Sequence, residues 1–165
     1  MTAWTEHLAR VGATLDDTAR SIAFAAPADE ARATETATIA VPLLHLGTIR
    51  AQGPDSAAFL HNLVSNDVKH MEADTAAWNS FNSPKGRMIA SFLVWTEEGG
   101  HALALSADIL PAFLKKFSMY VLRSKVKLAD ASAEIALIGL AGPQAVAIAQ
   151  ATGATLPAED MRQAV

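Results

Sequence analysis

Residues 83–95 carry the clearest strand pattern of the chain. Pro84 and Gly86 mark a turn at its start, and β-branched and aromatic residues follow. Side chains alternate between the faces of a strand, which predicts one wholly apolar face: Met88, Ala90, Phe92 and Val94. The other face mixes a cation and a hydroxyl with apolar residues: Arg87, Ile89, Ser91, Leu93 and Trp95. One face is therefore predicted to lie in the core, and the second to form either a half-wet sheet surface or a pocket.

Similar patterns predict the remaining elements. Apolar residues recur at helical spacing over residues 4–11, 54–64 and 110–117. Strands are predicted over residues 21–25, 39–51, 75–82, 101–105, 125–128 and 134–140, with a bend in the second of these. Residues 27–38 are rich in alanine, threonine and charge without a clear period, so they are predicted to be a connector.

A short pattern occurs twice. A predicted strand runs into Gly-Pro and then a helix at Gly53 and again at Gly142. Proline suits the first turn of a helix, because its missing N–H is not needed there. The intervening order of helix, three strands, helix and strand is one complete unit of a duplicated α+β fold. The sequence thus predicts a first α+β unit over about residues 40–130 and the start of a second, incomplete unit over about 134–152.

Composition narrows the function classes. Hydrophobic residues make up 51% of the 165 residues and charged ones 18%, which is ample material for a core. No apolar run is long enough to cross a bilayer and the first residues lack the order of a signal peptide, so a cytoplasmic protein without a membrane partner is expected. Cysteine is absent, and the five histidines lack metal-site spacing. The sequence therefore predicts no catalytic or metal-ligating residue.

Basic residues concentrate in the middle of a chain whose net charge is −4. Five of them fall close together: Lys115, Lys116, Arg123, Lys125 and Lys127. Such a cluster attracts phosphates or polyanionic ligands, but a solvated helix face and edge strand produce the same pattern. Both interpretations stay open, and no direct nucleic-acid binding is expected.

Several short blocks resemble one known family. They are Leu46-Gly47, the Gly-Pro block at 53–60, Ser-Asn-Asp-Val at 65–68, Lys-Gly-Arg at 85–87, the block at 120–126 and Gly-Leu-Ala-Gly-Pro at 139–143. In this order, over roughly residues 40–150, the chain resembles the N-terminal half of the YgfZ-type folate-binding proteins. These are relatives of the glycine-cleavage T-protein, an aminomethyltransferase that uses tetrahydrofolate. The resemblance implies a duplicated β-α-β folate-binding domain with strands exchanged between halves, of which residues 1–165 are the N-terminal part, and a separate C-terminal barrel that they lack.

The resemblance also implies which residues line the folate. The matching positions are Trp78, Ser91, Leu93 and Ser106, with Lys85 and Arg87 as partners of the glutamate carboxylates of folate. A pterin is a flat, hydrogen-bonding ring that suits an aromatic face, a few polar groups and aliphatic walls. Structural interpretations stand beside these: Trp78 as a core residue, Ser106 as a helix cap, and Lys85 and Arg87 as a solvated turn. Asn66 and Asp67 are interpreted as a turn that ends a helix.

The chain departs from T-proteins where they carry a pair of acids. Those positions are Ala90 and Ser91, and neither supplies a carboxylate for general base catalysis. Aminomethyl transfer by the T-protein route is therefore not expected, and a one-carbon transferase that takes its acid from elsewhere is the alternative.

YgfZ-type members are associated with folate-dependent maturation or repair of iron–sulfur enzymes, including tRNA-modifying ones. The resemblance implies tetrahydrofolate or a derivative as cofactor, and iron–sulfur proteins or their assembly factors as partners. Binding of folate by these residues alone is expected to be weak, because a cleft that lacks a wall leaves much of the ligand in water.

Overall fold

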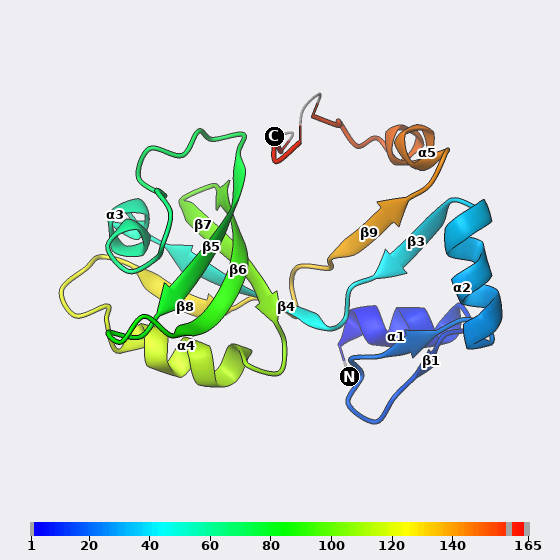
Figure 1. The fold of residues 1–165 in the computed structure, drawn as a ribbon, viewed down its shortest axis with the longest axis horizontal. Coiled ribbons are helices and arrows are strands. Elements are labelled where there is room, and N and C mark those ends of the chain that lie inside the picture. Colours follow the sequence, from blue (N-terminus) through cyan, green and yellow to red (C-terminus); the bar gives the residue numbers. More distant parts are fainter. Residues whose placement is uncertain (1, 158–159, 164–165) are drawn as a thin grey trace. The chain divides into compact units, whose positions relative to one another are not determined.

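The structure is a computed structural model that describes residues 2–157 and 160–163; residues 1, 158–159 and 164–165 of the predicted module lie outside the described part. The chain forms two compact units (Figure 1). The first unit comprises residues 1–46 and 133–156, and the second comprises residues 47–132 and 157–165.

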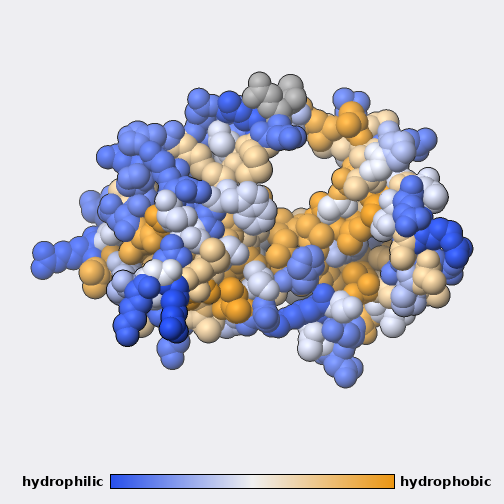
Figure 2. Space-filling view, in the orientation of Figure 1, coloured by the Kyte–Doolittle hydropathy of each residue, from blue (hydrophilic) through white to orange (hydrophobic). Residues whose placement is uncertain are grey.

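In its described residues the first unit contains three helices and two small antiparallel strand pairs. In chain order these are α1 (Ala3–Arg10), β1 (Thr14–Leu15), β2 (Ile22–Ala23), α2 (Pro27–Thr36), β3 (Ile39–Pro42), β9 (Ile138–Ala141) and α5 (Ala145–Ala151). Strand β1 pairs with β2, and β3 pairs with β9. Hydrophobic surface is exposed over β3 and β9 on the face that Figure 2 shows. Among the described residues of this unit, only Thr5 and Leu8 of α1 are buried, so the unit has little core of its own.

Helix α2 corrects the prediction of a connector over residues 27–38. Pro27 lies in its first turn, and the Glu30 carboxylate accepts hydrogen bonds from the backbone N–H groups of Phe24 at 2.6 Å and Ala25 at 3.0 Å. None of its residues is buried. A helix that buries no apolar stripe shows no apolar period, and this explains why the pattern did not reveal it.

The second unit is built on a five-stranded sheet with the order β5-β6-β7-β4-β8. Its elements are β4 (Leu46–Gln52), α3 (Ser56–His61), β5 (Ala76–Asn82), β6 (Met88–Glu97), β7 (Gly100–Ser106), α4 (Leu110–Ser118) and β8 (Lys127–Asp130). The two helices contribute to one core against one face of the sheet. That core is rich in aromatic rings: Phe59 from α3, Phe113 and Phe117 from α4, and Phe81 and Phe92 from the strands. We call the opposite face of the sheet the back face.

Strand β6 follows the predicted alternation along most of its length. Ala90, Phe92 and Val94 are buried in the core, as the pattern predicted, but Met88 is 64% exposed. A β-bulge causes the difference, because Ala90 pairs with Phe81 while Met88 already pairs with Asn82. The extra residue, Ile89, packs against the core. Such a bulge reverses the alternation on one side of it.

The two Gly-Pro sequences form turns of similar local structure. Each follows a strand and leads into a helix, as predicted: β4 into α3, and β9 into α5. Gly53 has φ +133° and lies against the backbone at Lys125, just before β8, the partner of β4. Gly142 has φ +115° and lies against Ala37 and Thr38, just before β3, the partner of β9. This repeated arrangement agrees with a duplicated unit, although superposition of the two copies stays a prediction.

Residues 160–163 lie along the start of β5. The backbone N–H of Ala76 donates to the carbonyl of Met161 at 2.8 Å, and Thr75 forms a β-bridge with Arg162. The Arg162 guanidinium forms ion pairs with Glu72 and Asp74. This segment therefore covers part of the edge of the sheet that β5 would otherwise expose.

Candidate functional site

Three of the residues that the resemblance implies for folate binding share the back face of the sheet. Trp78 on β5 lies directly opposite Leu93 on β6, and Ser80 lies opposite Ser91. Directly opposed side chains, and those two residues apart on one strand, point to the same face. The structure therefore brings together an aromatic ring, an aliphatic side chain and two hydroxyl groups.

Trp78 is not a core residue. Its side chain is 63% exposed, which excludes the interpretation of this tryptophan as part of the hydrophobic core. The backbone beneath it is held by Asn66, whose side-chain amide donates to the Trp78 carbonyl at 2.6 Å. The backbone N–H of Asn66 in turn donates to the buried side chain of Asn79 at 2.7 Å. Asn66 thus positions β5, a role that no spacing pattern in the sequence could reveal.

Ser106 lies at the end of β7, close to the level of Ser91. Leu93 pairs with Ala104 in the antiparallel ladder. Ser106, two residues after Ala104, therefore comes level with Ser91, two residues before Leu93. Its hydroxyl donates to the Asp108 carboxylate, which also accepts from the backbone N–H of Ile109 at 3.0 Å. The N-cap of α4 is Ile109, so Ser106 is not the helix cap that the sequence suggested. The structure instead places an acid, Asp108, beside this hydroxyl.

Lys85 and Arg87 lie in the turn before β6. The turn is closed by a hydrogen bond from the Ser83 N–H to the Arg87 carbonyl at 2.8 Å, and both cationic residues are exposed. The bulge between this turn and Ser91 interrupts the alternation from which a shared face of Arg87 and Ser91 was predicted. The structure therefore does not bring the two cations onto the back face with the other residues, and their role in binding stays a prediction.

One ion pair crosses the back face of the sheet. The Arg50 guanidinium lies 2.8 Å from the Glu97 carboxylate, and both side chains are largely buried. Arg50 is on β4 and Glu97 ends β6, at the opposite end of that strand from Ser91. Shielding from water strengthens such a pair, so we assign it to holding the strands together rather than to a ligand.

Asp67 follows Asn66 and is held by two histidines. Its carboxylate accepts from the backbone N–H of His70 at 3.0 Å and lies 2.8 Å from the His70 ring and 3.1 Å from the His61 ring. The hydrogen bonds from His70, side chain first, lower the pKa of Asp67 to about 2. The carboxylate is thus engaged within its own loop, in agreement with the predicted turn. Among residues 2–157 and 160–163, no group of three or more histidines and acids is arranged to hold a metal ion.

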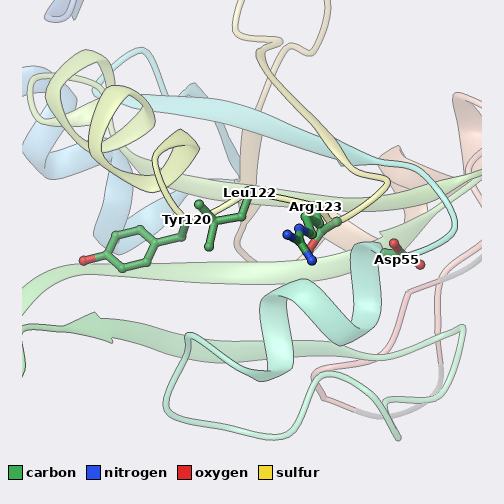
Figure 3. Close-up of a pocket in the computed structure, with 5 residues that line it drawn as sticks. Asp55, Tyr120, Leu122 and Arg123 are labelled. Carbon is green, nitrogen blue, oxygen red and sulfur yellow. The ribbon is translucent and has the colours of Figure 1, made fainter.

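A hollow in the second unit lies elsewhere. It is lined by Asp55, Tyr120, Leu122, Arg123 and Ser124, none of which belongs to the predicted folate set (Figure 3). The exposed Trp78 and the neighbouring hydroxyls therefore remain the best candidate site on the sheet, and the hollow is a separate feature.

The sequence matches the GCVT N-terminal domain over residues 4–163. The chain belongs to this family. The crystal structure of the glycine cleavage system aminomethyltransferase T from Bartonella henselae has a similar fold, with a TM-score of 0.76 and 18% sequence identity. The alignment covers 95% of the present chain and 45% of the Bartonella chain. This likeness concerns the fold, and it confirms the predicted α+β fold of the T-protein type.

Curated relatives of this GCVT-family chain include proteins with quite different names. It is 35% identical over 106 residues to the iron-sulfur cluster assembly factor IBA57 homolog of Mycosarcoma maydis, covering 54% of this chain and 26% of that protein. It is 31% identical to the tRNA-modifying protein YgfZ of Vibrio vulnificus, covering 65% and 33%, and 27% identical to an aminomethyltransferase of Bacillus subtilis, covering 77% and 35%. The predicted resemblance is confirmed, and the chain spans about a quarter to a third of these relatives.

Proposed function

We propose that the chain is a tetrahydrofolate-binding module of the YgfZ type that serves the maturation or repair of iron–sulfur enzymes, including tRNA-modifying ones. The observation that carries the proposal is the exposed Trp78 opposite Leu93, with Ser91 and Ser80 beside them. An aromatic face, an aliphatic wall and hydroxyl groups on one surface suit a flat, hydrogen-bonding pterin. The names of the IBA57 and YgfZ relatives support the choice of pathway.

The side chains of this chain have defined parts in the proposal. The Trp78 ring stacks against the pterin, Leu93 supplies apolar contact, and the hydroxyls of Ser91 and Ser106 hydrogen-bond its polar edge. Lys85 and Arg87 attract the glutamate carboxylates from the neighbouring turn by charge. When bound, folate supplies one-carbon chemistry, and these residues contribute binding and orientation.

Calorimetric titration of tetrahydrofolate into the wild-type chain and into Trp78→Ala tests this site. Loss of one aromatic stacking contact of about 1–1.5 kcal/mol weakens binding by roughly tenfold. Phe24→Ala is the matched control, because Phe24 is also an exposed aromatic residue but lies in the first unit. Equal affinity of Trp78→Ala and the wild type would show that tetrahydrofolate does not bind at Trp78 on β5.

A folate-dependent aminomethyltransferase is the second candidate, and Asp108 is the observation that favours it. Its carboxylate accepts a hydrogen bond from the Ser106 hydroxyl. Ser106 lies at the end of β7 that is level with Ser91. An acid at this position is the group that Ala90 and Ser91 do not provide. Several relatives are named aminomethyltransferases.

The two functions differ in a transfer assay with an aminomethylated lipoyl carrier protein and tetrahydrofolate. The binding module produces no methylenetetrahydrofolate above background. Turnover that falls at least a hundredfold in Asp108→Asn, with tetrahydrofolate affinity retained, would establish the transferase instead.

A further inference from the structure

The loop after α4 displays apolar side chains that the core does not use. Leu122 is 88% exposed, and Met119 and Tyr120 are exposed beside it. Leu122 also has φ +43°, in the left-handed region that costs a residue with a Cβ atom about 1–2 kcal/mol. Strained residues of this kind cluster at functional sites, because the surrounding structure must hold them in place.

The loop is held firmly by its neighbours. The Asp55 carboxylate accepts from the backbone N–H of Lys125 at 2.6 Å, and the Ser124 N–H donates to the Val121 carbonyl at 2.8 Å. The Tyr120 ring forms a T-shaped contact with the core ring Phe81, with 5.5 Å between the ring centroids. Leu122 is therefore presented in a fixed geometry, so a partner need not immobilise the loop.

Exposed cations surround these apolar side chains. Lys115 and Lys116 end α4, and Arg123, Lys125 and Lys127 follow in the loop and β8. Residues 109–127 include no acid, although the whole chain has 17 acidic and 13 basic residues. Within residues 2–157 and 160–163, none of the five cationic side chains forms an ion pair. We call the surface formed by residues 115–127 the basic loop surface.

The hollow of this surface follows the loop. In Figure 3, Tyr120 and Asp55 mark its two ends, and Leu122 and Arg123 lie between them. We propose that the basic loop surface docks an acidic segment of a partner protein that carries apolar side chains, which pack against Leu122. Charge complementarity selects the acidic segment, and its apolar side chains shield the exposed aliphatic side chain from water.

A protein fits this surface better than a nucleic acid. Single-stranded nucleic acids bind through phosphates and through bases stacked on aromatic rings. The most exposed apolar side chains here, Leu122 and Met119, have no aromatic face, and the Tyr120 ring is already in a T-shaped contact with Phe81. The surface also differs from the proposed folate site, because Tyr120 contacts the core ring Phe81 while Trp78 lies on the back face. Lys127 pairs with Gln52 and so faces the back side, but it lies on β8, at the opposite edge of the sheet from β5.

The probe for this proposal is a synthetic 12-residue peptide in which glutamates flank a central Leu-Phe pair. We expect it to shift the amide NMR signals of residues 115–127 and to bind more weakly as salt is added. Replacing its Leu-Phe pair with serines, or its glutamates with lysines, lowers the affinity at least tenfold. Leu122→Ser in the protein, and Arg123→Glu combined with Lys125→Glu, do the same. Lys69→Glu, a charge reversal at an exposed lysine outside this surface, leaves the affinity within twofold of wild type.

Leu122→Gly separates docking from folding. Glycine adopts a positive φ without strain, so this variant retains or gains thermal stability while it loses peptide binding. Peptide shifts that map elsewhere, or binding that survives Leu122→Gly, would overturn the proposal. So would tighter binding of a 12-nucleotide oligouridine than of the peptide, or self-association of the chain that depends on Leu122. Leu122 is outside the proposed folate site, so the Leu122 variants should bind tetrahydrofolate as the wild type does. A tetrahydrofolate titration of these variants therefore distinguishes loss of docking from failure of the folate site.

Discussion

At the scale of single residues, Ser56 and His101 form a buried polar pair. The Ser56 hydroxyl donates to the Ala51 carbonyl at 2.6 Å, and its oxygen lies 2.9 Å from Nδ1 of His101. The hydroxyl proton is committed to Ala51, so Nδ1 is the protonated nitrogen and donates to Ser56. His101 is only 7% exposed, and this burial lowers its pKa. The folded chain therefore holds His101 as a neutral imidazole.

This pair predicts a loss of stability in mild acid. The lowered pKa of folded His101 means that the unfolded chain, with a histidine pKa of about 6.5, takes up the proton first. The corresponding stability is complete above about pH 6.5 and is lost as the pH falls toward the folded pKa. His101→Asn keeps a hydrogen-bond donor but does not titrate, so it should flatten this dependence in urea unfolding at several pH values.

The exposed His45 provides the matched control for that measurement. His45→Asn replaces an exposed histidine and leaves His101 in place, so the free energy of unfolding should keep its wild-type decline below about pH 6.5. A decline of equal steepness in His101→Asn would show that other groups cause the acid sensitivity.

At the scale of elements, the turn between β4 and α3 depends on the absence of a side chain at Gly53. A Cβ atom there would lie 2.1 Å from the Lys125 carbonyl oxygen, and φ is +133°. The close approach brings the start of β8 against the end of β4, with which β8 pairs. This contact and the hydrogen bond from Lys125 to Asp55 join the turn to the loop of the basic surface.

Gly53→Ala is therefore expected to destabilise the chain by more than about 2 kcal/mol, because backbone strain adds to a clash with backbone atoms. Gly99→Ala is the matched control. Gly99 also has a positive φ, +77°, but a Cβ atom there meets nothing within 4 Å, so only the strain of about 1–2 kcal/mol applies. Chemical denaturation of both variants measures the difference, and equal losses would mean that the close approach at Gly53 is relaxed in solution.

At the scale of the whole molecule, the two units differ in how much they bury. Helices α2 and α5 of the first unit have no buried residue. Strand β7 of the second unit is buried from His101 to Leu105, and β6 buries Ala90, Phe92 and Val94. None of the helices in the described residues has the length and apolar character needed to cross a membrane. The difference in burial between the units predicts that local stability varies along the chain according to buried apolar contact.

Native-state hydrogen exchange is expected to show this difference directly. Amides of α2 and α5 should exchange much faster than those of β6 and β7, because opening these helices exposes little apolar surface. Helix α4 is the internal control, since it is also a helix but buries Phe113 and Phe117. Protection of α2 and α5 equal to that of α4 would contradict the distribution of burial described above.

Local patterns in the sequence were sufficient for much of the fold. Alternation with a period of two identified the core face of β6 and placed Ser91 and Leu93 on the other face, because that period depends only on neighbouring residues. Gly-Pro chemistry located the starts of α3 and α5. The α+β class followed from the order of these elements.

Contacts between distant residues were decided only by the tertiary structure. The pairing of β3 with β9, the bulge that turns Met88 outward and the hydrogen bond from Asn66 to Trp78 have no local signature. The exposure of Trp78 also has no local signature, because its position in the sequence pattern is compatible with the core and with the surface. The physical reason is that a residue's chemistry and spacing determine what it can pack against, while the assembled sheet determines which partner it meets.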